Sequence, residues 1–228
     1  MNLKQSRLLK VAGICGILSA IVFFICIAAS VYHASWFSWT ENWLSELGGS
    51  FGENPIWAAR GMASVVFNSG LIIAGTIGIL FSIAIRKSRI FTTGSGRIGT
   101  SLLFVNMSAL CGVGIFPVTL GKIHVWSSLA FFGLIPLFLF VVGFEMRNLF
   151  GKKWWWMINL LSVISLCSVS IFLFMPHLSN YSKAIAEMVM LCSIFVFCTA
   201  LSIKLLKVSF GYKEINAGLK NINAKIMY

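Results

Sequence analysis

Charged residues are scarce in this chain of 228 residues, and acidic residues are the scarcest. Only 11% of the residues are charged, with six aspartate or glutamate residues against 18 lysine or arginine residues. A soluble domain carries about 25% charged residues. Hydrophobic residues make up 58% of the chain and its mean hydropathy is +0.91, so most of it is expected to lie in lipid.

Cysteine is absent from the predicted loops. All six cysteines fall inside long apolar runs, and no two of them have the C-x-x-C spacing of a zinc site. An extracellular disulfide framework is therefore not indicated. The cysteines are expected to pack as small apolar side chains.

No stretch alternates apolar and polar residues as the strands of a membrane barrel do. Instead, six apolar runs are long enough to cross about 30 Å of hydrocarbon, which takes about 20 residues of helix. The chain is therefore predicted to be an all-α membrane protein with one six-helix transmembrane domain over residues 1–228. The first run is too long for a cleaved signal peptide, so we expect it to remain as a span. The predicted spans cover about residues 11–31, 59–85, 98–116, 125–143, 154–175 and 184–203.

Lysine and arginine are distributed unevenly among the connections. With the N-terminus inside, fifteen of the 18 fall in cytoplasmic segments, and only Arg60, Lys122 and Lys183 remain outside. Because basic residues are retained on the cytoplasmic side, we predict a multi-pass protein of the cell membrane with both termini in the cytoplasm. The basic tail over residues 207–228 can rest on anionic lipid. Membrane lipids are the expected partners, and a nucleic-acid partner is not expected because no basic and aromatic platform is present.

The longest predicted outer loop, residues 32–58, contains "SWTENWLSELGG" at residues 38–49. Ser38 and Glu41 have the spacing of a capping box, and Gly48 and Gly49 are typical helix stops. We predict a short amphipathic helix over residues 39–47. Its tryptophans share one side, and the other side carries the polar residues Glu41, Asn42, Ser45 and Glu46. The polar side faces either water, with the helix resting on the membrane surface, or the mouth of the bundle.

Other ionisable groups gather at the same predicted outer ends. All three histidines, His33, His124 and His177, lie there, and Glu187 lies about one turn inside the sixth span. Intramembrane carboxyl groups are functional candidates by default. Glu145, next to an inner end, is expected to be solvated or locally paired.

Two asparagines lie deep within predicted spans. Asn68 and Asn106 are each roughly 15 Å from the outer end, at the helical rise of about 1.5 Å per residue. An amide at this depth needs a partner away from lipid. A hydrogen bond between the two is favoured over a contact with a ligand.

Three motifs resemble a known family. "SWTENWLSELGG", "FNSGLIIAG" at residues 67–75 and "GIFPVTLGKIH" at residues 114–124 are similar to the prokaryotic membrane proteins called domain of unknown function 998. The resemblance implies a multi-spanning membrane protein and attaches no reaction to it. The resemblance also implies that the residues matching its motifs are important: Ser45, Gly48, Asn68, Gly70, Gly114, Pro117 and His124. One departure is Val118, where relatives often have an acidic residue.

Two functional classes follow from these residues. In the favoured one, a polar vestibule on the outer face binds or handles a lipid or small solute, with ligand-binding candidates His33, Asn68, Asn106, His177 and Glu187. In the alternative, an outward-facing hydrolase or transferase acts on a lipid-linked substrate through His124, Ser45, Glu41 and Glu46. No HExxH motif or close histidine pair is present, so neither a metal site nor a cofactor is predicted.

Overall fold

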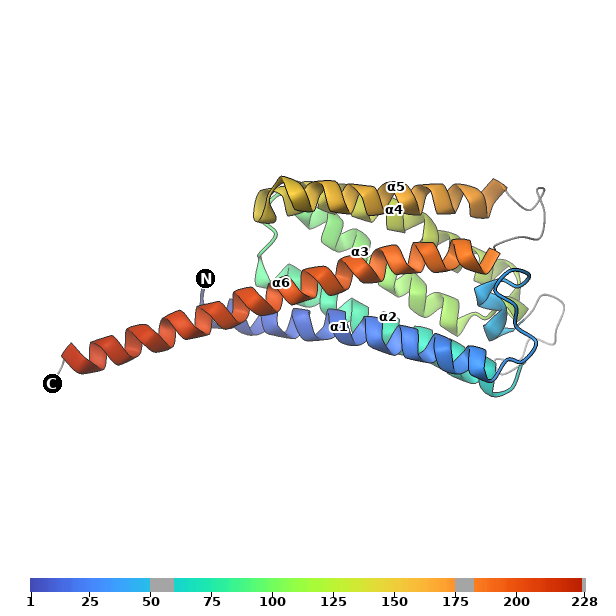
Figure 1. Ribbon diagram of the computed structural model, residues 1–228, viewed down its shortest axis with the longest axis horizontal. Helices are drawn as coiled ribbons and strands as arrows, with labels where there is room; N and C mark the ends of the chain where they lie inside the picture. The colour runs from blue at the N-terminus through green and yellow to red at the C-terminus, as the bar shows by residue number, and fades with distance from the viewer. Residues whose placement is uncertain (50–59, 175–182, 227–228) are drawn as a thin grey trace.

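The computed structural model describes residues 1–49, 60–174 and 183–226, and within these ranges the chain forms helices and no strand (Figure 1). Six long α-helices run back and forth along one axis, and two short 3₁₀ helices lie in the connections. The elements are α1 Leu3–Tyr32, η1 Leu44–Gly48, α2 Met62–Ser88, α3 Gly94–Ile115, η2 Val118–Leu120, α4 Lys122–Phe150, α5 Lys152–Phe174 and α6 Lys183–Ile226.

Each α-helix is long and apolar enough to cross a bilayer, since its most apolar stretch has a mean hydropathy between 1.6 and 2.7. Every predicted span overlaps one of these helices, so the prediction of an all-α, six-span fold is confirmed. The helices extend beyond the predicted spans because they continue through polar ends. α1 begins early because the side chains of Asn2 and Gln5 form a capping box, each accepting the other's backbone N–H at 2.9 Å.

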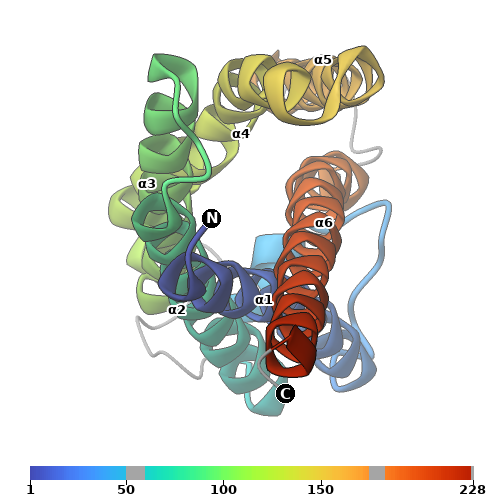
Figure 2. The same ribbon diagram turned by 90° about the vertical axis from the view of Figure 1, so that its left-hand side faces the viewer.

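The six helices form a closed ring. Each helix packs against the next one in the chain, and α6 returns to pack against α1 (Figure 2). α4 also contacts α6. Because the first and last helices close the ring, side chains from distant parts of the sequence meet in one interior.

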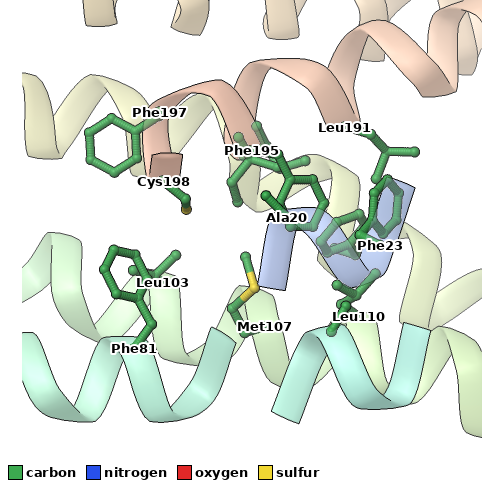
Figure 3. Close-up of a cluster of buried hydrophobic side chains, with 14 of the residues drawn as sticks. Ala20, Phe23, Phe81, Leu103, Met107, Leu110, Leu191, Phe195, Phe197 and Cys198 are labelled. Atoms are coloured by element: carbon green, nitrogen blue, oxygen red, sulfur yellow. The ribbon is translucent and has the colours of Figure 1, made fainter. Parts of the chain in front are cut away.

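Large apolar side chains fill this interior. Figure 3 shows side chains of α1, α2, α3 and α6 converging there, among them Phe23, Phe81, Met107 and Phe195. The rings of Phe23 and Phe195 stack with their centroids 4.4 Å apart. Between helices in lipid, such close packing replaces the hydrophobic driving force of a soluble core.

Small residues bring neighbouring helices close together. On α2, a Cβ added at Gly75 would lie 2.9 Å from the carbonyl oxygen of Met107 on α3. On α1, a Cβ added at Gly13 would lie 2.9 Å from the carbonyl oxygen of Ser202 on α6. Ser19 of α1 donates a hydrogen bond of 2.8 Å to the carbonyl oxygen of Ala74 on α2. The backbones therefore approach as helices do at small-residue interfaces.

Of the two alternatives expected for Glu145, the solvated one is wrong, because the side chain is fully buried. Its carboxylate accepts a 3.0 Å hydrogen bond from the backbone N–H of Thr92 and a hydrogen bond from the hydroxyl of Thr93, the N-cap of α3. A carboxylate at a helix N-terminus is favoured by the helix dipole. Glu145 therefore ties α4 to the start of α3.

The two ends of the bundle differ. The N-terminus and the C-terminal end of α6 lie at one end, and α6 extends well beyond the bundle there (Figure 1). The opposite end holds η1 and η2, which contact each other. We call this second end the η1 end.

Candidate functional site at the η1 end

The segment at residues 38–49 folds differently from the predicted helix over 39–47. It forms a turn followed by the 3₁₀ helix η1 at Leu44–Gly48, with Trp43 in an extended conformation between them. The backbone N–H of Ser38 donates to Asn42 Oδ1 at 2.8 Å, and the N–H of Asn42 donates to the Ser38 carbonyl at 3.0 Å. Such local side-chain bonds compete with a continuous helix, which corrects the prediction in both extent and helix type.

Two buried polar side chains hold η1 at its ends. At its start, the backbone N–H of Leu44 donates to Glu187 Oε2 at 2.5 Å, and Ser45 also hydrogen-bonds this carboxyl group. At its end, the side-chain amide of Asn68 donates to the carbonyl oxygen of Gly48 at 3.2 Å. Leu44 and Leu47 are buried in the bundle. η1 is therefore inserted into the mouth of the bundle.

A pocket of about 400 Å³ opens beside η1, between η1, η2, α4, α5 and α6. We call it the η1 pocket. Its polar lining consists of Ser45, Glu46, His124, Ser128 and Glu187. Its apolar lining consists of Trp43, Val118, Val125, Leu129 and Leu173. Both kinds of surface therefore face one cavity.

His124 is held at both ring nitrogens. Nδ1 lies 2.7 Å from the carbonyl oxygen of Phe116, which can only accept a hydrogen bond, so Nδ1 carries the proton. Nε2 then accepts a hydrogen bond from the hydroxyl of Ser128, 3.2 Å away. The side chain is 4% exposed. This arrangement fixes the ring orientation and leaves a basic nitrogen beside a hydroxyl group.

The ionisable groups that line the η1 pocket are two carboxyl groups and one imidazole. Glu46 is positioned by Asn42, whose side-chain amide donates to Glu46 Oε2 at 2.7 Å. Glu187 comes from α6, and no lysine or arginine of the described residues lines the pocket. The ionisable lining of the η1 pocket therefore consists of two acids and one imidazole.

A smaller cavity of about 20 Å³ adjoins the η1 pocket toward the bundle interior. Ser45, Ser128 and Glu187 line both cavities. The remaining walls are apolar and include Phe23, Phe67 and Phe131. A cavity of this size has room for about one water molecule.

The structure brings together four of the nine predicted site residues. Ser45, Glu46, His124 and Glu187 all line the η1 pocket. His33 and Glu41 do not line it; both are exposed, and the His33 ring packs edge-on against Tyr32. His177 lies outside the described residues.

The two asparagines do not bond to each other as predicted. Asn68 reaches Gly48, as described above, and the amide of Asn106 donates to the carbonyl oxygen of Phe131 on α4 at 2.6 Å. Both side chains are buried. The need for a partner inside the bundle could be predicted, but the identity of that partner depends on helix rotation, which composition does not specify.

Sequence reasoning did not identify Ser128. It lies one helical turn after His124, and residues four apart share a helix face. The His-x-x-x-Ser spacing could therefore have predicted the contact. For metal binding, no three His, Cys, Asp or Glu side chains in residues 1–49, 60–174 and 183–226 are grouped closely enough to hold an ion.

A family model described as "Protein of unknown function (DUF998)" matches residues 17–204, a range that includes part or all of every α-helix. The chain belongs to the DUF998 family. No curated protein and no solved structure matched the chain.

The motifs that resemble the DUF998 family meet in space at Asn68. A Cβ added at Gly48 would lie 3.3 Å from Asn68 Cγ, and one added at Gly114 would lie 2.6 Å from the Asn68 carbonyl oxygen. The first motif therefore meets the second at Gly48, and the third meets it at Gly114. In this DUF998 protein, the second and third motifs therefore meet at Asn68, whose side-chain amide holds the end of η1 in the first motif.

Proposed function

We propose that this multi-pass membrane protein binds an amphipathic small molecule or lipid in the η1 pocket. The observation that carries the proposal is the mixed lining of the pocket, with five polar residues and five apolar residues around about 400 Å³. Ligand pockets in proteins have volumes of about 300–1,000 Å³ and combine an apolar wall with a few polar groups.

The apolar part of the lining suits a hydrocarbon chain. Val125 of α4 and Leu173 of α5 line the pocket, and they are also 40% and 48% exposed on the surface of the bundle. In a bilayer, that surface faces acyl chains. An apolar chain can therefore extend from the η1 pocket between α4 and α5 toward lipid.

The polar part favours a neutral or cationic head group. An anionic group about 5 Å from a pocket carboxylate would be repelled by about 3 kcal/mol at an effective dielectric constant of about 20. A cationic group would be attracted by a similar amount, and Trp43 offers an aromatic face to it. A hydroxyl or ester group can hydrogen-bond with Ser45 or Ser128.

The η1 end is proposed to face the outside of the cell membrane, with both termini in the cytoplasm. The support is the positive-inside distribution, in which the η1 end keeps only three of the 18 basic residues. A ligand would then enter from the outer leaflet.

Binding of three probes with the same chain length tests the proposal. The full-length protein in zwitterionic nanodiscs would be titrated with decylammonium, decanol and decanoate, and empty nanodiscs would correct for partitioning. Decylammonium is expected to bind at least tenfold more tightly than decanoate, which corresponds to about 1.4 kcal/mol. Glu46→Gln keeps an acceptor for Asn42 and removes the charge, so it should reduce this ratio to threefold or less.

Glu41→Gln is the matched control, because Glu41 is an exposed carboxylate outside the η1 pocket. It should leave the ratio unchanged. Equal binding of decylammonium and decanoate would contradict the proposed charge preference. Failure of all three probes to bind would overturn the proposed function.

The enzymatic alternative is favoured by one specific observation, the contact between His124 and Ser128. Ser45, the serine that the sequence offers for this alternative, instead hydrogen-bonds Glu187. A catalytic version of the η1 pocket would therefore use Ser128.

A further inference from the structure

We propose that Ser128 is a nucleophile activated by His124, and that the η1 pocket hydrolyses a neutral carboxylic ester carrying an apolar chain. The inference rests on the proposed function, because the same pocket must first admit the amphipathic substrate. It adds a reaction and assigns a role to a residue that the sequence motifs did not include.

The hydroxyl group of Ser128 hydrogen-bonds a side-chain base rather than a backbone carbonyl group. Serines inside these helices commonly donate back to the carbonyl oxygen four residues earlier, as do Ser30, Ser69, Ser101, Ser108, Ser127 and Ser168. Ser128 instead directs its hydroxyl to the His124 ring. Its proton therefore points to a base rather than to its own helix backbone.

The three groups form the arrangement of an activated nucleophile. The carbonyl oxygen of Phe116 holds Nδ1–H of His124, and Nε2 accepts the Ser128 proton. A hydroxyl group beside a base that a third group orients is the general signature of nucleophilic catalysis. The carbonyl oxygen here performs the orienting role that a carboxylate performs in other serine hydrolases.

Position in the cavity supports this assignment. Ser128 lines both the η1 pocket and the cavity of about 20 Å³ behind it. The substrate would occupy the pocket, and one water molecule fits in the small cavity. The nucleophile therefore lies between a site for the ester and a site for the second reactant.

The reaction balances without another reagent. Ser128 Oγ forms a bond to the ester carbonyl carbon while its proton passes to His124 Nε2. Collapse of the tetrahedral intermediate breaks the bond between that carbon and the alkoxy oxygen, which leaves as an alcohol with the proton from Nε2. Water then attacks the acyl group on Ser128 and gives a proton to Nε2. Oγ departs, takes that proton back, and releases the carboxylic acid.

Labelling with a decyl fluorophosphonate tests the nucleophile directly. Ser128 Oγ would displace fluoride from phosphorus and give a stable adduct on the peptide containing Ser128. Wild-type protein in nanodiscs is expected to take up one label per chain, detected by mass spectrometry. Ser128→Ala should abolish labelling, and the neighbouring Ser127→Ala should retain it, because Ser127 does not line the η1 pocket.

The variant His124→Asn tests the role of His124 as a base while keeping its structural hydrogen bond. An asparagine amide can still donate to the Phe116 carbonyl oxygen but cannot accept the serine proton as a base. Labelling should slow at least a hundredfold, the lower range for loss of a general base. Thermal unfolding would show that both variants fold. Hydrolysis of p-nitrophenyl octanoate by the same samples should decrease in parallel.

The outcome separates the two proposals. If folded wild-type protein binds decylammonium but is not labelled at Ser128, the binding function stands and the nucleophile is overturned. Labelling that persists in Ser128→Ala also overturns it. If none of the amphipathic probes binds, the proposed function itself fails.

Discussion

Glu187 has the clearest structural role among the individual residues. It is 2% exposed, lies on α6, and accepts hydrogen bonds from the start of η1. A carboxyl group buried away from water needs hydrogen-bond partners within the protein. The backbone N–H groups at the start of η1 provide these partners. Glu187 in turn accepts the hydrogen bonds that these buried N–H groups need.

Replacing Glu187 with leucine should therefore destabilise the protein. The variant leaves the N–H of Leu44 buried without an acceptor, which costs about 1–3 kcal/mol. Thermal unfolding in one detergent would measure the change, and hydrogen exchange at Leu44 should become faster. Glu41→Leu, on the exposed side of the segment, should change stability by no more than about 0.5 kcal/mol. An unchanged melting temperature in Glu187→Leu would refute this role.

The sequence predicted which residues line the candidate site better than it predicted which partners those residues contact. Ser45 and Glu46 follow from the polar side of the predicted helix, and His124 and Glu187 follow from their positions near the outer ends of predicted spans. Ser128 was overlooked because a serine in a membrane helix normally bonds to its own backbone. The burial of Glu145 was unexpected because its partners, Thr92 and Thr93, lie about fifty residues away in the chain.

Among the elements, α2 is the central packing element of the first half of the bundle, since it packs against both α1 and α3. Gly75 is the critical point on its α3 side. An added Cβ would lie 2.9 Å from the carbonyl oxygen of Met107 and 3.0 Å from the backbone nitrogen of Cys111. Backbone atoms of a packed helix cannot yield as a flexible side chain can.

Gly75→Ala should destabilise the bundle by about 1–3 kcal/mol, because it forces the two helices apart. Gly133→Ala is the control, since a Cβ at Gly133 meets nothing within 4 Å. Alanine has a higher helix propensity than glycine, so this control should be neutral or stabilise the protein by up to about 1 kcal/mol. Equal melting temperatures for the two variants would show that α2 and α3 are not closely packed at Gly75.

The helix predicted over residues 39–47 differs from η1 because hydrophobic periodicity alone does not determine the type and extent of a short helix. The spacing of tryptophan and leucine was compatible with an α-helix over residues 39–47, but Asn42 closes a turn with Ser38 instead. Leu44 and Leu47 are buried, whereas Trp39 is exposed. Contacts with Glu187 and Asn68 select the 3₁₀ helix, and neither contact is local in sequence.

At the scale of the whole molecule, the six spans were predictable because about 20 apolar residues in a row have few alternatives to a membrane helix. The closure of the ring by contact between α1 and α6 could not be predicted in the same way, because it depends on the packing of small residues on these two helices. Because the described part of the chain has six α-helices, the start of α1 and the end of α6 lie at the same end of the bundle (Figure 1).

Labelling of single cysteines in intact cells would test the orientation. Lys4 and Thr40 are both exposed; Lys4 lies in the first turn of α1, and Thr40 lies in the turn before η1, at the opposite end of the bundle. Thr40→Cys should react with a membrane-impermeant thiol reagent in intact cells, and Lys4→Cys should react only after permeabilisation. The unsubstituted chain controls for its six native cysteines. The reverse pattern would place the η1 end in the cytoplasm.

The most direct test of the central claim, that an amphipathic ligand occupies the η1 pocket, is to locate a bound probe. A decylammonium probe with a diazirine in its chain would be crosslinked to the protein in nanodiscs and mapped by peptide mass spectrometry. Adducts are predicted at Val125, Leu129 or Leu173, and excess unlabelled decylammonium should suppress them. Adducts in the apolar groove of about 640 Å³ between α5 and α6, lined by Leu161 and Cys192, with none in the η1 pocket, would contradict the claim.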